Sequence, residues 1–82
     1  MILERLKNLR EDNDLLQKQV ADELKIPERT YGNYELGVRR IPLELLIELA
    51  IFYNTSTDYL LGLTNEKAPY ERAKEIKTNS LL

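Results

Sequence analysis

Apolar residues near the start of the chain recur at steps of three and four, at Ile2, Leu3, Leu6 and Leu9. The charged and amide side chains between them would occupy the opposite face, so the pattern predicts an amphipathic helix. Asn13-Asp14 should end this helix, because both residue types tolerate left-handed backbone and compete for helical hydrogen bonds. A second helix over about residues 16–24 is predicted by one apolar stripe: Val20, Ala21 and Leu24.

Proline and glycine residues mark the boundaries of the helices that follow. Pro27 has a fixed φ that suits a first helical turn and Gly37 suits the left-handed position after a helix end, so a third helix is expected between them, ending at Leu36. Pro42 would open a fourth helix, with apolar positions spaced for burial: Leu45, Leu46, Leu49, Ala50 and Tyr53. Ser56 is a good N-cap for a short fifth helix over about residues 57–61, before Gly62.

The predicted helices are joined by short breaks and no stretch shows the alternation of a strand, so the fold class is all-α. A chain of 82 residues supplies one core, and we expect one compact five-helix domain over residues 1–63. From Thr64 the composition becomes that of a linker followed by a short polar tail, residues 64–82, and the pattern is compatible with one extra helix over residues 70–77.

The composition excludes several kinds of functional site. The chain has no Cys and no His, which removes thiolate zinc sites, thiol nucleophiles and the commonest general base, so we expect no enzyme, no metal and no cofactor. No apolar run is long enough to span a bilayer, and the first residues lack the pattern of a secretory signal. The expected location is therefore the cytoplasm, with no membrane partner.

The second and third predicted helices indicate a nucleic-acid reader. Two helices separated by two or three residues cross at a large angle, so the second projects from the surface and fits the major groove, which is about 12 Å wide. Helical spacing places Tyr31 and Tyr34 on a core-facing side of the projecting helix. The other side carries the expected base-reading residues: Glu28, Arg29, Gly32 and Asn33.

Each of these four residues also has an alternative interpretation. Arg29 can pair with guanine or bind a phosphate, and Asn33 can pair with adenine. Glu28 either accepts from cytosine or only complements the positive end of the helix dipole. Gly32 costs about 1 kcal/mol in a helix interior relative to alanine, so either it allows close approach to the groove or the core absorbs the loss.

The net charge of −2 argues mildly against a nucleic-acid partner, but basic residues gather in the middle of the sequence: Lys18, Lys25, Arg29, Arg39 and Arg40. A basic surface is therefore compatible with an acidic chain.

The order and spacing of four segments resemble the Xre/Cro family of phage-type repressors across about residues 2–63. These segments are Leu15-Leu16-Gln17-Lys18-Gln19-Val20-Ala21, Ile26-Pro27-Glu28-Arg29-Thr30-Tyr31, Tyr34-Glu35-Leu36-Gly37 and Ser56-Thr57-Asp58-Tyr59-Leu60-Leu61-Gly62. The resemblance implies a lambda-repressor-like fold and a sequence-specific transcriptional regulator that binds a double-stranded DNA operator. The chain departs from the family pattern where Asp14 and Lys25 replace a frequent Gly and where Leu16 replaces a frequent Ser or Thr cap.

The resemblance also implies roles for individual residues. Gln17 would contact a phosphate and brace the reading helix, and Arg39 and Arg40 would lie on the sugar-phosphate backbone. Arg10 and Glu35 would form a partly buried structural ion pair. Lys18 and Lys25 are further phosphate candidates, although lysines are common on any helical surface. The Tyr31 hydroxyl must reach water or a partner, with a phosphate as one option.

One reading helix contacts few base pairs, so we expect a homodimer on a near-palindromic operator, acting as a repressor. The fifth helix and the tail offer candidates for the interface, although core burial explains most of them equally well: Phe52, Tyr59, Leu63 and Tyr70. The chain shows no separate sensing domain, so no small-molecule ligand is expected. The main alternative is a protein-interaction module, such as an antitoxin or a regulator-binding protein, which the acidic balance would suit.

Overall fold

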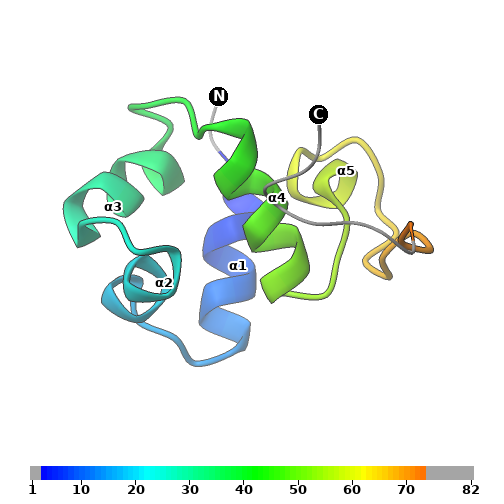
Figure 1. Ribbon diagram of the computed structural model, residues 1–82, viewed down its shortest axis with the longest axis horizontal. Coiled ribbons are helices and arrows are strands. Elements are labelled where there is room, and N and C mark those ends of the chain that lie inside the picture. Colours follow the sequence, from blue (N-terminus) through cyan, green and yellow to red (C-terminus); the bar gives the residue numbers. More distant parts are fainter. Residues whose placement is uncertain (1–2, 74–82) are drawn as a thin grey trace. The chain divides into compact units, whose positions relative to one another are not determined.

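The computed structural model describes residues 3–73, so the expected core position Ile2 lies outside the described part. The helices are α1 (Glu4–Asp12), α2 (Gln17–Leu24), α3 (Glu28–Leu36), α4 (Leu43–Phe52) and α5 (Thr57–Leu60), shown in Figure 1. Residues 3–73 contain no strand, and the all-α prediction with five helices is confirmed. The chain divides into two compact units, residues 1–41 and residues 42–82, and each is described by itself.

α1 ends as its sequence predicts. The Asn13 side chain donates from Nδ2 to the carbonyl of Leu9 at 2.7 Å, which competes with the helical hydrogen bonds at this end. Asp14 then adopts a φ of 55°, in the left-handed region. This reversal leads the chain to Leu15, whose carbonyl accepts a hydrogen bond from Arg10 Nη1 at 3.0 Å.

α2 begins at Gln17, one residue after the predicted start. Leu16 is the N-cap in extended backbone, and its side chain has no acceptor for the first amides of the helix. Gln19 instead accepts the Leu16 backbone N–H through Oε1 at 2.7 Å, which supplies one half of a capping box. α2 ends at Leu24, and its C-cap Lys25 has a φ of 59°, the left-handed conformation for which glycine would be the easiest residue.

α3 follows at once and is the packing centre of the first unit. Pro27, expected in the first helical turn, is instead the N-cap in extended backbone, one residue before the helix. Gly37 follows the last helical residue with a φ of 75°, as predicted. α2 packs against α3, and α1 also contacts it. The buried apolar residues of this unit are Leu3, Leu6, Leu9, Val20, Ala21, Leu24, Tyr31 and Tyr34. The third helix is therefore held by one face and leaves the other exposed.

The second unit contains α4 and α5, which pack on each other. Pro42 caps α4, and its buried positions are Leu46, Leu49 and Ala50. The predicted core positions Leu45 and Tyr53 are only half-buried. α5 begins as expected, because Ser56 Oγ accepts the Tyr59 backbone N–H at 2.9 Å.

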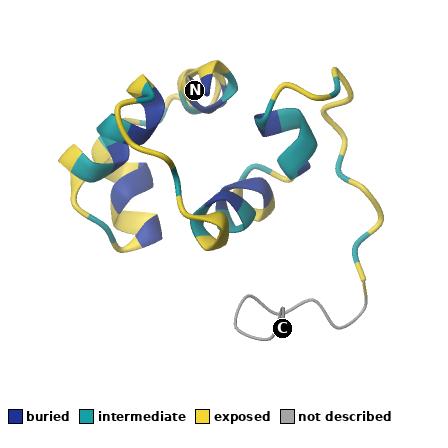
Figure 2. Cartoon of the chain, turned by 90° about the horizontal axis from the view of Figure 1, so that it is seen from above, coloured by how far each residue is buried: buried dark blue, intermediate teal, exposed yellow. Residues whose placement is uncertain are grey.

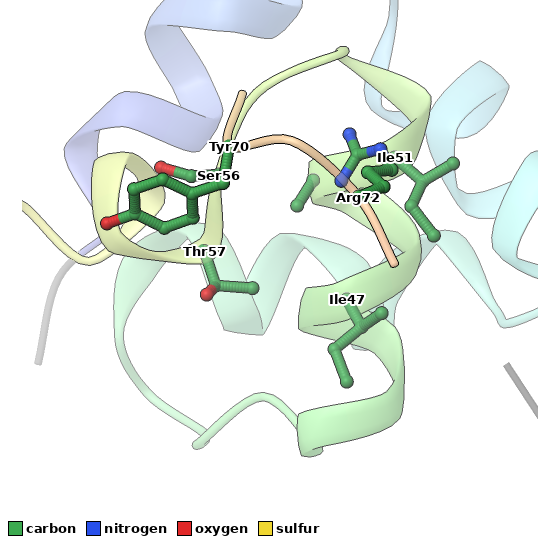
Figure 3. A pocket seen from close by; sticks show the side chains of 7 residues that line it. Ile47, Ile51, Ser56, Thr57, Tyr70 and Arg72 are labelled. Atoms are coloured by element: carbon green, nitrogen blue, oxygen red, sulfur yellow. The ribbon is translucent and has the colours of Figure 1, made fainter. Parts of the chain in front are cut away.

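Residues 64–72, predicted to be a linker, make hydrogen bonds to the α4–α5 corner. Thr55 Oγ1 donates to the carbonyl of Lys67 at 2.6 Å, Arg72 Nη2 donates to the carbonyl of Thr55 at 3.3 Å, and the Tyr70 hydroxyl donates to Asp58. Tyr70 and Arg72 line a pocket of about 200 Å³ together with α4 residues and the start of α5 (Figure 3). The expected extra helix is not present at residues 70–73, and residues 74–77 lie outside the described part. Within residues 3–73, no helix has the length and apolar character required to cross a membrane.

Candidate nucleic-acid interface

The two sides of α3 differ in exposure in the way that helical spacing predicts. Tyr31 is fully buried and Tyr34 is 8% exposed, so both belong to the core. Glu28 and Arg29 are exposed, and Asn33 is half-buried on the same helix. The option that the Tyr31 hydroxyl touches a phosphate is wrong, because the whole residue is 0% exposed.

The five basic candidates all lie in the first unit and all are exposed: Lys18, Lys25, Arg29, Arg39 and Arg40. Lys18 forms an ion pair with Asp22 one turn along α2, at 3.2 Å, and both side chains are 66% exposed. An exposed pair of this kind is weak, so Lys18 can exchange Asp22 for another anion at little cost. The first unit therefore presents several cations that no buried contact holds.

The loop after α3 is tied to the end of that helix. The backbone N–H groups of Val38 and Arg39 donate to the carbonyl of Asn33 at 3.0 and 3.3 Å. Figure 2 shows this loop as mostly exposed, and Arg39 and Arg40 are among its exposed residues. The two arginines are thereby placed at a defined end of the helix that carries Asn33.

A partly buried ion pair connects α1 to α3. Arg10 Nε lies 2.8 Å from Glu35 Oε2 and Arg10 Nη2 lies 3.2 Å from Oε1, so the contact is bidentate. The side chains are 12% and 3% exposed. The structure thus places together the two residues that the resemblance pairs, although 25 positions separate them in the sequence.

The surroundings of Glu35 favour its ionised form. Burial alone would raise the pKa of this carboxyl, but hydrogen bonds from Arg10, Tyr31 and Gln17 and the charge on Arg10 outweigh burial and lower the pKa. The same pairing raises the pKa of Arg10. Glu35 is therefore a buried charge whose stability depends on donors from three helices.

Gln17 is the residue that connects this ion pair to the exposed face. Its Nε2 donates to Glu35 Oε1 at 3.2 Å, which is a brace between α2 and α3. A Cβ built on Gly32 would come within 3.2 Å of Gln17 Oε1. The bond agrees with the brace on the reading helix that the resemblance implies for Gln17. Sequence reasoning missed that Gln17 and Gly32 face each other, and only the isolated glycine inside a helix signalled a special position.

Comparisons with known proteins agree with this arrangement. A family model described as helix-turn-helix matches residues 6–60. In Bacillus subtilis (strain 168), the uncharacterised HTH-type transcriptional regulator YobD is 38% identical over 77 residues, covering 94% of this chain and 69% of that protein. The HTH-type transcriptional regulator AnsR of the same organism is 40% identical over 82 residues, covering all of this chain and 71% of AnsR.

A further relative in that organism, the HTH-type transcriptional regulator ImmR, is 41% identical over 58 residues, or 71% of this chain and 46% of ImmR. No solved structure gave a significant match. The chain thus spans about 70% of the length of YobD and AnsR and less than half of ImmR.

Proposed function

This chain belongs to the helix-turn-helix family of DNA-binding transcriptional regulators, and we propose that it is a repressor that reads a duplex operator with α3 as a homodimer. The resemblance found in the sequence is confirmed by the family match and by relatives that are named as regulators. These names also favour a regulator over an enzyme. The observation that carries the proposal is the exposed polar side of α3, opposite the buried Tyr31 and Tyr34 and beside exposed arginines.

Base recognition is assigned to three side chains of α3. Arg29 is exposed near the start of the helix and has the geometry to donate two hydrogen bonds to guanine. Asn33, one turn further on, can both donate to and accept from adenine. Glu28 can accept from cytosine, and each good pair discriminates by about 1–3 kcal/mol. This set would give α3 a short, defined recognition sequence.

Phosphate contacts are assigned to side chains that flank α3. Arg39 and Arg40 follow it, and Gln17, Lys18 and Lys25 belong to α2 or its end. Contacts of this kind fix the orientation of a protein on the duplex and carry no sequence information. Their number would set how steeply the affinity falls with salt.

A homodimer is proposed because one α3 reads too few base pairs for strong specificity and two-fold regulators use two half-sites. Of the four residues expected as interface candidates, Phe52, Leu63 and Tyr70 are exposed and available for such an interface, and Tyr59 is half-buried. The proposed place of action is the cytoplasm, where a bacterial-type regulator meets its operator.

The test is selection from a random-sequence duplex library at two salt concentrations. The wild type should enrich a two-fold motif, Asn33→Ala should relax one position of each half-site, and Arg40→Ala should weaken all sites equally and reduce the salt slope by about one. Lys7→Ala, which removes an exposed cation of α1, is the matched control and should leave the affinity for all sites and the salt slope unchanged. A wild type that enriches no sequence at low salt would reject groove reading and favour a protein partner.

A further inference from the structure

The glycine inside α3 is not required by its backbone. Gly32 lies in the middle of a helix that runs from Glu28 to Leu36. The positive-φ glycines of the chain are Gly37 and Gly62, and Gly32 is not one of them. Alanine is the best helix former and glycine one of the poorest, so an alanine here would favour the helix. Some other property of this position must account for the missing side chain.

The side chain nearest to the space beside Gly32 is that of Gln17 in α2. A Cβ on Gly32 would lie 3.2 Å from Gln17 Oε1 and 3.8 Å from Gln17 Cδ and Nε2, and these are its three nearest atoms. The first distance is shorter than ordinary van der Waals contact. A Cβ would therefore displace the Gln17 amide by a few tenths of an ångström, and no other group would have to move.

The other end of the same amide is held by Glu35. Gln17 Nε2 donates to Glu35 Oε1 at 3.2 Å, and the carboxylate is itself fixed by Arg10 at 2.8 Å. An amide NH₂ group carries two protons, and the bond to Glu35 uses one of them. Gln17 as a residue is half-buried, so it is not closed off from the surface.

We infer that Gly32 is a positioning residue that leaves room for the Gln17 amide. The bond to Glu35 can then orient the amide so that the second N–H of Gln17 points toward a DNA phosphate. The inference rests on the proposed function and changes one part of it, since Gly32 then acts through Gln17 and does not read a base. It also explains why a residue that weakens the helix stands at this position. Function and helix stability have opposite requirements at Gly32.

The test is a double-mutant cycle with the full 82-residue chain. Gly32→Ala, Gln17→Ala and the double variant are compared with the wild type for thermal stability and for affinity to the duplex that the wild type enriches most from a random library. Gly32→Ala should raise Tm by less than about 4 °C, because the gain in helix propensity is partly offset by the weakened bond from Gln17 to Glu35. It should also weaken binding about tenfold without changing base preference, because a hydrogen bond to a charged phosphate is lost.

In the Gln17→Ala background the same Gly32→Ala change should have less than about a twofold effect on affinity, since the group that it displaces is gone. Equal losses in both backgrounds would mean that Gly32 itself approaches the DNA, and no loss in either would mean that Gln17 needs no positioning. Both results overturn the inference. Asn8→Ala, on the exposed face of α1, is the control for a gain in helix propensity and should leave DNA affinity unchanged.

A measurement on the free protein separates this inference from the proposed function. The side-chain NH₂ resonances of Gln17 should move in Gly32→Ala and exchange faster with water, because the amide is displaced from Glu35. Unchanged resonances would overturn the positioning role even if DNA binding were intact. A wild type that selects no duplex while the Gln17 resonances do move would instead reject the proposed function, and with it the phosphate contact, and would leave only the positioning of the Gln17 amide by Gly32.

Discussion

Replacing Arg10 with methionine should be the most damaging single change in the polar cluster. The variant keeps the apolar stem of the side chain but removes two of the hydrogen bonds to Glu35, at 2.8 and 3.2 Å, and the opposing charge. Glu35 then remains as a carboxylate with 3% of its side chain exposed. Breaking a buried pair in this way costs about 3–5 kcal/mol. The whole domain is expected to have only about 4–12 kcal/mol of stability, so the loss is a large share of it.

Urea denaturation at neutral pH measures this cost, and two further variants calibrate it. Lys18→Met breaks the exposed pair with Asp22, in which both side chains are 66% exposed, and should cost no more than about 0.5 kcal/mol. The double variant Arg10→Met with Glu35→Met should recover part of the loss, because no buried charge is left unpaired, whereas the Leu15 carbonyl and the Tyr31 hydroxyl each still lose a hydrogen-bond partner. The reasoning fails if Arg10→Met costs no more than Lys18→Met.

The contribution of Glu35 to the free energy of unfolding should depend on pH with opposite signs in the wild type and in Arg10→Met. In the wild type the pKa of Glu35 is lowered, so its contribution is fully present above the unfolded value of about 4.3 and is lost as the pH falls through the lower, folded value. In Arg10→Met, burial should raise the pKa of Glu35 above its usual range. The penalty in the variant is then greatest at neutral pH and is relieved as the pH falls toward about 5. If Arg10→Met instead lost stability relative to the wild type as the pH fell from neutral to about 5, the raised pKa would be refuted.

Three further predictions test local features of the fold, two by urea denaturation and one by an NMR titration. Ser56→Ala removes the acceptor of the Tyr59 N–H and should cost about 1 kcal/mol, and an unchanged midpoint would show that this cap contributes nothing. Lys25→Gly relieves a φ of 59° and should stabilise the protein by about 0.5–1 kcal/mol, whereas Glu23→Gly inside α2 should destabilise it by about 1 kcal/mol. Tyr31→Phe should raise the pKa of the Glu35 carboxyl in an NMR titration, because one of its hydrogen bonds is lost, and an unmoved titration would exclude that bond.

Most helix boundaries could be predicted because single residues determine them. Gly37 and Gly62 adopt positive φ after α3 and α5, and Ser56 caps α5 through its side chain. The start of α2 could not be placed so well, since Leu16 has no capping atom and the acceptor comes from Gln19. Lys25 shows the same limit, because the tight connection to α3 imposes a left-handed conformation that its own local preference disfavours.

In the candidate site, too, some features could be predicted from the sequence and others could not. Helical period alone separated the buried Tyr31 and Tyr34 from the exposed Arg29, because the direction of a side chain on a helix follows from its position. The contact between Gln17 and Gly32 depends instead on how α2 crosses α3. Spacing along the chain predicts that the two helices cross, but it does not fix the distance between two side chains to a few tenths of an ångström.

The polar cluster also determines which variants can separate folding from DNA recognition. Glu35 accepts hydrogen bonds from Arg10, which stabilises the first unit, and from Gln17 at the edge of the proposed interface. Any change of Glu35 should therefore lower both the stability of the protein and its affinity for DNA. Gly32 has no side chain, so it makes no side-chain hydrogen bond in the cluster. It affects the cluster only because the absence of a Cβ leaves room for the Gln17 amide. A methyl group at Gly32 should therefore strengthen the helix while it weakens the phosphate contact that we propose for Gln17. This opposition of signs is what a general loss of folding cannot produce, and it makes position 32 the most informative place to test how α2 and α3 act together on DNA.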